Sequence, residues 1–224
     1  MDEAPATRDA TDTAVRAAAA EPENQLRADT YRLLGRLLAA APDDEMLTLL
    51  AKAPVTEDGD LADVASKRQA TSAGRTTARP VSDEYEALFI GIGRGELMPY
   101  SSWYLTGFLM EQPLAMLRAD LRRLGFERQD GVREPEDHAA ALCETMALLA
   151  GDDTALETQA EFFEAHIGPW IARLFRDMQE ATSARFYRAV GQLGEQFIEM
   201  DQRYLEMVDR PEEIPAKPTR PGVA

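Results

Sequence analysis

The residue types that metal ions and nucleophilic catalysis require are scarce in this sequence. His138 and His166 are the two histidines of the 224-residue chain, and Cys143 is its one cysteine. On a helix, positions 138 and 143 face different directions, so the two side chains do not converge on one ion. Cys143 lies in an apolar helical stretch without a sign of thiolate activation. The sequence therefore predicts no catalytic residue, no metal site and no bound cofactor.

A glycine-rich segment keeps one alternative open. Gly91-Ile92-Gly93-Arg94-Gly95 is similar to a phosphate-binding loop, but it lacks the trailing Gly-Lys-Ser/Thr and follows an expected helix rather than a strand. Its glycines are better suited to end that helix and to adopt positive φ angles. A small helical hydrolase, or a nucleotide- or metal-binding protein, that uses Asp137 and His138 stays as the alternative function.

The segment Glu134-Pro135-Glu136-Asp137-His138 gathers three acids beside a histidine. Acids in the first turn of a helix complement the helix dipole and accept hydrogen bonds from free N–H groups. The same carboxylates can bind a guanidinium group through charge-assisted hydrogen bonds, with His138 orienting one of them. Composition favours the first interpretation, and the residues alone leave the second one open.

Three aromatic residues follow Pro99 in the segment Pro99-Tyr100-Ser101-Ser102-Trp103-Tyr104. Such side chains can fill the interior of a bundle, or they can line an apolar groove whose polar groups suit a hydrophobic peptide. Methionines surround the segment, and methionine adapts to varied peptide surfaces although it is also common in helix cores. Composition does not decide between the two interpretations.

The elements that position these residues are expected to be helices. Helical hydrophobic periodicity dominates the chain, and no alternating strand pattern or hairpin turn appears. The sequence therefore predicts an all-α fold, a single helical-bundle domain of eight to ten helices. Prolines and glycines mark where helices begin and end, and Thr154 with Glu157 is expected to form a capping box. The expected helical segments are about residues 26–41, 43–53, 82–92, 113–124, 135–150, 155–168, 169–178 and 186–205.

The bundle is expected to occupy residues 21–210. Residues 1–20 and the Pro-rich residues 211–224 are predicted to be disordered tails. Residues 55–79 are polar and rich in Ala, Thr and Arg, so they are predicted to form a weakly structured linker between the N-terminal helices and the main bundle.

The net charge of the chain limits the classes of molecule that it is expected to bind. A formal net charge of −16 argues against binding of nucleic acid and anionic lipid, and it would steer a cationic partner toward the protein. On charge alone, the simpler interpretation is that the acidity keeps the protein soluble. No 18-residue apolar run and no signal-peptide pattern appears, so membrane insertion is not expected. Together with the single cysteine, this pattern predicts a cytoplasmic protein.

In the order and spacing of its segments, the sequence resembles the TorD/DmsD-type redox-enzyme maturation chaperones. The resemblance extends over about residues 26–205 and is most specific over residues 84–187, while residues 43–80 and the two tails show little of it. Each matching segment is weakly specific by itself. The matching segments are Tyr85–Phe89, Pro99–Tyr104, Glu134–His138, Gln159–Trp170 and Phe186–Tyr187.

This resemblance implies an all-helical protein without enzymatic activity. It implies binding of the N-terminal, usually twin-arginine, signal peptide of a molybdopterin oxidoreductase of the DMSO reductase superfamily, or of the apo catalytic subunit, until the cofactor has been inserted. The client would be an enzyme such as a formate dehydrogenase or an S- or N-oxide reductase. A helical adaptor without a binding site is the remaining alternative, and the sequence leaves open whether the chain forms a homodimer.

The resemblance also implies roles for individual residues. The candidates for the apolar part of peptide recognition are Leu88, Phe89, Tyr100, Trp103 and Tyr104. Ser102 is a further candidate for contact with the peptide or client. The candidates for the polar part are Glu134, Asp137 and His138, which would receive the arginines. The expected supporting residues, which would brace the helices around the site, are Pro99, Pro135, His166 and Trp170.

Overall fold

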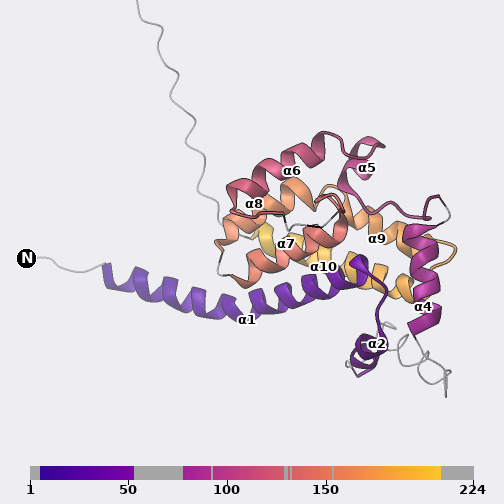
Figure 1. Ribbon diagram of the computed structural model, residues 1–224. Coiled ribbons are helices and arrows are strands. Elements are labelled where there is room, and N and C mark those ends of the chain that lie inside the picture. The colour runs from indigo at the N-terminus through magenta and orange to yellow at the C-terminus, as the bar shows by residue number, and fades with distance from the viewer. Residues whose placement is uncertain are drawn as a thin grey trace, which may run out of the picture.

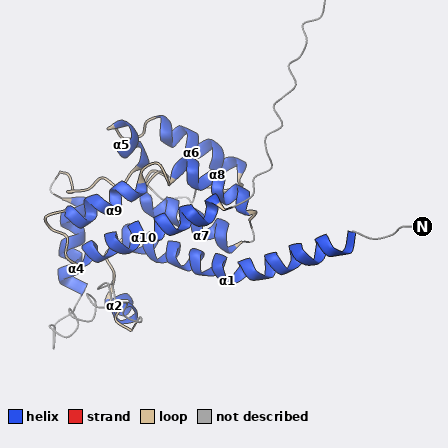
Figure 2. Ribbon diagram, turned by 180° about the vertical axis from the view of Figure 1, so that it is seen from behind, coloured by secondary structure: helices blue, strands red, loops and turns tan. Residues whose placement is uncertain are grey.

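The computed structural model describes residues 6–52, 78–91, 93–128, 131, 133–152 and 154–207, and it describes side chains from residue 22 onward. Over these residues the chain forms nine α-helices and one π-helical segment, with no β-strand (Figures 1 and 2). The prediction of an all-α, single-domain fold is confirmed. The elements are α1 (Ala6–Ala39), α2 (Asp44–Leu50), α4 (Ala78–Tyr85), η1 (Glu86–Ile90), α5 (Ser101–Thr106), α6 (Gln112–Arg123), α7 (Ala139–Gly151), α8 (Leu156–His166), α9 (Ile171–Glu180) and α10 (Phe186–Glu206).

Helix α7 lies at the centre of the bundle. Most of its side chains are buried, and many are alanines, because the helix is covered on several faces. It packs along α1, and Gly35 permits this close approach: a Cβ at Gly35 would lie 3.3 Å from the carbonyl oxygen of Ala140. Figure 1 shows α1 crossing below the bundle with its first turns extending beyond it.

Helices α9 and α10 form a second tightly packed pair (Figure 2). Two glycines of α10 face Phe175 of α9. A Cβ at Gly194 would lie 2.4 Å from the Phe175 ring, and one at Gly191 would lie 2.6 Å from the Phe175 carbonyl oxygen. The glycines are therefore needed for the contact between these helices, since neither approach leaves room for a methyl group.

A buried polar network ties α1 to the C-terminal half of the chain. The guanidinium of Arg27, 3% exposed, pairs with the fully buried carboxylate of Asp201 in α10. The same guanidinium donates to Gln159 Oε1 of α8 at 2.7 Å, and the hydroxyl of Tyr31 donates to Asp201 Oδ2 at 2.7 Å. Charges this deeply buried are tolerated because each finds an opposite charge or a hydrogen-bond partner.

Several helix boundaries lie where local sequence signals predicted them. Asp43 caps α2 by accepting a hydrogen bond from the Met46 amide at 2.8 Å, Pro113 lies in the first turn of α6, and Gly91 ends η1 with φ 61°. A Cβ at Gly91 would lie 2.0 Å from the Arg94 carbonyl oxygen. The interpretation that the glycine segment ends a helix is therefore confirmed for Gly91.

Other boundaries differ from expectation. The helix expected from Pro135 begins at Ala139, because residues 134–137 form a turn closed by the hydrogen bond from the His138 amide to the Pro135 carbonyl, 3.1 Å. The capping box expected at Thr154 is wrong: no side chain caps α8, and the Thr154 carbonyl instead accepts a hydrogen bond from the Gln159 side chain. Gln159 also accepts a hydrogen bond from Arg27, so its side chain links the start of α8 to α1.

The predicted tails and linker agree with the structure only in part. Helix α1 begins at Ala6, within the segment expected to be a tail, where an Ala-rich run has the highest intrinsic helix propensity. Residues 55–77 of the expected linker and the C-terminal tail lie outside the described residues, and residues 78–79 belong to α4. Among the described residues, no helix is both long and apolar enough to cross a membrane.

Candidate functional site

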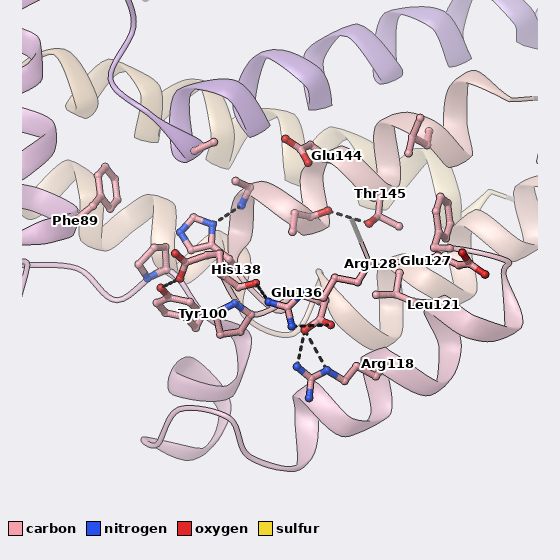
Figure 3. A pocket seen from close by; sticks show the side chains of 18 of the residues that line it. Phe89, Tyr100, Arg118, Leu121, Glu127, Arg128, Glu136, His138, Glu144 and Thr145 are labelled. Carbon is pink, nitrogen blue, oxygen red and sulfur yellow. Dashed lines mark hydrogen bonds and ion pairs between the residues drawn. The ribbon is translucent and has the colours of Figure 1, made fainter. Parts of the chain in front are cut away.

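A groove of about 1010 Å³ opens between α6 and α7 (Figure 3). One wall is the face of α7 that carries Ala141, Glu144, Thr145 and Leu148 at helical spacing. The opposite wall is formed by α6 and the loop after it, with Arg118, Leu121, Arg122 and Phe126. The volume is typical of a site that buries a ligand the size of a drug or a short peptide segment.

One end of the groove is built by two segments that lie far apart in the sequence. Tyr100 and His138 form an isolated antiparallel bridge, in which the Ala139 amide donates to the Pro99 carbonyl at 2.8 Å and the Ser101 amide donates to the Asp137 carbonyl at 3.0 Å. The rings of Tyr100 and His138 meet edge to face with centroids 5.0 Å apart. The bridge brings the predicted aromatic segment and the predicted acidic segment together.

His138 and Tyr100 are held in defined ionisation states at this end. His138 is the N-cap of α7, and its Nδ1 accepts a hydrogen bond from the Ala140 amide at 3.1 Å. Burial lowers the pKa of His138, so the imidazole is neutral at pH 7. The Tyr100 hydroxyl donates a short hydrogen bond to Glu134, and burial together with this bond raises the pKa of Tyr100 well above its usual value.

Asp137 lies beneath the groove rather than in it. Its side chain is fully buried, and its Oδ2 accepts a hydrogen bond from the Ser102 amide at 3.0 Å, which caps the start of α5. Oδ1 has no hydrogen-bond partner among the residues that the structure describes. Asp137 and His138 thus bind different backbone amides, so they do not form the acid–base pair that a hydrolase would need.

The aromatic residues of the predicted site separate into two groups. Phe89 lines the groove beside Tyr85, with ring centroids 5.0 Å apart, and Tyr100 lines it from the bridge. Leu88 and Ser102 are fully buried. Of the two remaining candidates, Trp103 is half-buried beneath the Arg94 guanidinium, and Tyr104 is buried and donates to Asp177 Oδ2 at 2.8 Å.

The expected supporting residues also separate. Pro99 and Pro135 line the groove, whereas His166 and Trp170 lie away from it. His166 Nε2 is 2.8 Å from Asp120 Oδ2 of α6, and the Trp170 indole donates to the His166 carbonyl at 2.7 Å. These contacts fasten α8 to α6, the helix that forms the second wall.

Basic side chains in the groove were not anticipated from the sequence. Arg118 binds Glu136 with Nη2 2.8 Å from Oε2, and Arg128 Nη1 lies 3.7 Å from Oε1 of the same carboxylate. Burial opposes ionisation of Glu136, but the hydrogen bond and charge of Arg118 outweigh it and hold the pKa of Glu136 below its usual range. The one available signal was the spacing of Arg118 and Arg122 outside the leucine stripe of α6, which is also the pattern of any solvent-facing helix surface.

Glu144 was likewise missed. It is exposed on α7, lines the groove, and has no ion-pair or hydrogen-bond partner within the described part of the chain. Nearby Cys143 is fully buried, and burial raises the pKa of its thiol to about 12, as expected of an inert core cysteine. No group of three His, Cys, Asp or Glu side chains among the described residues is arranged to hold a metal ion.

A helical bundle with an open groove, lined by aromatic rings and by charges of both signs, offers the kind of surface to which a peptide can bind. The sequence profile of the nitrate reductase delta subunit family matches residues 38–176 of the chain. The chain therefore belongs to the nitrate reductase delta subunit family, which includes the TorD-type chaperones. This match confirms the resemblance to those chaperones that was found in the sequence.

Curated relatives agree with this family. The chain is 26% identical over 203 residues to the chaperone protein TorD of Shewanella loihica, covering 80% of this chain and 93% of the relative. It is 24% identical to the TorD chaperone of Shewanella piezotolerans, covering 83% and 95%, and 27% identical to that of Vibrio cholerae, covering 53% and 59%. Because these relatives are chaperones, they support the prediction that the chain is not an enzyme.

Proposed function

We propose that this protein is a cytoplasmic chaperone that binds the leader peptide, the apo catalytic subunit, or both, of a molybdopterin oxidoreductase and releases it after cofactor insertion. The observation that carries the proposal is the groove between α6 and α7, in a chain whose relatives are TorD chaperones. The groove joins aromatic and aliphatic side chains to unpaired acid, the combination that a cationic peptide with an apolar stretch requires.

The charge of the protein favours such a ligand over a neutral peptide. The chain carries a formal net charge of −16, which would speed the approach of a twin-arginine leader. The arginines in the groove are already counted in this net charge, and Arg118 and Arg128 both pair with Glu136. The Arg122 guanidinium is turned along α6, where its Nε donates to the Arg118 carbonyl at 2.9 Å.

The candidate residues predicted from the sequence would act in two ways, some by direct contact with the peptide and others by supporting the groove. Phe89, Tyr100, Glu134 and His138 line the groove and would contact the peptide directly. The remaining candidates would act from beneath by holding α5 and the bridge in place. They are Leu88, Ser102, Trp103, Tyr104 and Asp137.

A groove-filling substitution tests the proposal. Ala141 is half-buried in the α7 wall, and in Ala141→Trp the indole would occupy the space of the peptide. Ala165→Trp, on an exposed position of α8 outside the groove, is the matched control. Isothermal titration calorimetry of the full chain with a twin-arginine leader peptide should show low-micromolar or tighter binding for the wild type and the control, and none for Ala141→Trp.

Two results would contradict the proposal. If the wild type bound neither a twin-arginine leader nor a molybdoenzyme apo subunit, the chaperone assignment would lose its ligand. If Ala141→Trp kept wild-type affinity with an unchanged circular dichroism spectrum, the groove would not be the binding site.

A further inference from the structure

The acids in and around the groove differ in their partners. Glu134 accepts a hydrogen bond from the neutral Tyr100 hydroxyl, Glu136 pairs with two arginines, and Asp137 is buried beneath the groove. Glu127, in the loop after α6, lines the groove at its aliphatic end without an ion-pair or hydrogen-bond partner among the described residues. A guanidinium arriving at Glu136 would have to displace a bonded arginine, which costs much of what it gains. Within the Glu134–Asp137 segment, Glu136 and Asp137 are therefore unavailable to an arginine of the peptide.

Glu144 is the groove carboxylate on α7 whose charge is unused. It projects from the α7 wall, is exposed, and has no partner among the described residues. The base of its side chain packs against α1, since a Cβ at Gly35 would lie 3.4 Å from Glu144 Cγ. The Cγ of Glu144 thus packs against α1, and Figure 3 shows no hydrogen bond or ion pair to its carboxylate from the residues drawn there.

The aromatic end of the groove, toward the start of α7, also favours a cation. Helix α1 ends at Ala39, which lines the groove, and the C-terminal end of a helix carries a partial negative charge. Tyr85 joins this end to the groove, because its hydroxyl donates to the Leu38 and Ala39 carbonyls at 3.2 and 2.9 Å. The rings of Tyr85, Phe89 and Tyr100 supply faces on which a guanidinium can stack.

The opposite end of the groove is aliphatic. Leu148 follows Glu144 by one turn of α7, about 6 Å along the axis, and faces Leu121 and Phe126 across the groove. An extended peptide advances about 3.3 Å per residue, so two residues cover this step. Figure 3 shows Phe89 and Leu121 at opposite sides of the groove, with Glu144 between them.

We propose that Glu144, on the α7 wall between the aromatic and aliphatic ends of the groove, is the residue that selects an arginine of the leader peptide, and that the apolar stretch following the arginines runs toward Leu121 and Leu148. This assignment rests on the proposed function and deepens it. It moves arginine recognition from the Glu134–Asp137 segment to the α7 wall.

The test combines a charge-removing variant with two synthetic peptides. In one peptide two consecutive arginines precede an apolar Leu/Ala stretch, and in the other both arginines are replaced by glutamine. Glu144→Gln keeps the size of the side chain and removes its charge. Glu180→Gln, at an exposed position near the end of α9, changes the net charge equally outside the groove and is the matched control.

We expect Glu144→Gln to weaken binding of the arginine peptide about tenfold and to leave binding of the glutamine peptide unchanged. Glu180→Gln should bind both peptides as the wild type does. Equal weakening of both peptides, or no change for either, would overturn the role of Glu144 while leaving the groove as the binding site. If the wild type bound neither peptide but Ala141→Trp blocked an apo subunit, the leader would not be the ligand and Glu144 would select no arginine.

Discussion

Asp137 offers a sharp test of which predicted site residues act on the fold and which on the ligand. Its Oδ2 is the side-chain acceptor for the Ser102 amide at the start of α5, and both residues are fully buried. In Asp137→Ala this amide would lose its partner without gaining water, at a cost of about 1–3 kcal/mol. A second, longer contact from Ser101 Oγ at 3.5 Å adds little.

A compensating gain sets the upper limit. Oδ1 of Asp137 is buried without a hydrogen-bond partner among the described residues, so removing the carboxylate also removes a desolvation cost. We therefore expect Asp137→Ala to lower the free energy of unfolding by about 2 kcal/mol, equivalent to about 4–8 °C in Tm for a chain of this size. Asp137→Asn keeps an acceptor for the Ser102 amide and should lose about half as much.

The assay pairs urea unfolding with calorimetric binding of the arginine peptide at 15 °C, where both variants are folded. Binding by the folded Asp137→Ala protein should weaken by less than about threefold, since Asp137 does not line the groove. Loss of binding with unchanged stability would refute this reasoning, because it would show that the buried carboxylate reaches the peptide.

Two further predictions concern titration and packing. Because burial lowers the pKa of His138, the folded state binds fewer protons there than the unfolded state, so the free energy of unfolding should fall as the pH drops below about 6.5. In His138→Asn, which keeps an N-cap acceptor, urea unfolding between pH 7 and 5 should show a smaller loss of that free energy. The same dependence on pH in the variant and the wild type would contradict the role of His138. Gly194→Ala should lower the free energy of unfolding by about 1–3 kcal/mol, since its Cβ would lie 2.4 Å from the Phe175 ring. Gly151→Ala is the control and should be close to neutral, because its close contact would be with the flexible end of Arg32. Thermal melts in which Gly151→Ala is the less stable variant would refute the packing argument.

The sequence predicted the helices well because most carry their own boundary signals. Asp43 at the start of α2, Pro113 in α6 and Gly91 after η1 act on neighbouring backbone atoms, so their effects can be inferred locally. The start of α7 was misplaced because the acids after Pro135 have the composition of a first helical turn. The bridge between Tyr100 and His138 instead holds these acids in a turn. The two bridge residues are 38 positions apart, so neither segment alone contains a signal that predicts the contact.

The groove was predictable only in part for the same reason. Phe89, Tyr100, Glu134 and His138 belong to segments whose types and order suggested a site, and the structure places all four in one groove. Arg118 and Glu144 lie on helix faces that have the composition of ordinary solvent-facing surfaces. Their position in a groove depends on how α6 and α7 pack, which a periodicity does not specify.

The pairing of Arg27 with Asp201 has a consequence for how the molecule is made. The two residues are 174 positions apart, and Arg27 has no other carboxylate partner among the described residues. While the chain leaves the ribosome, the Arg27 guanidinium therefore lacks its carboxylate partner until α10 has been synthesised. Because α1 also packs along α7, which forms one wall of the groove, we expect this part of the bundle to reach its final packing only after the last helix has joined it.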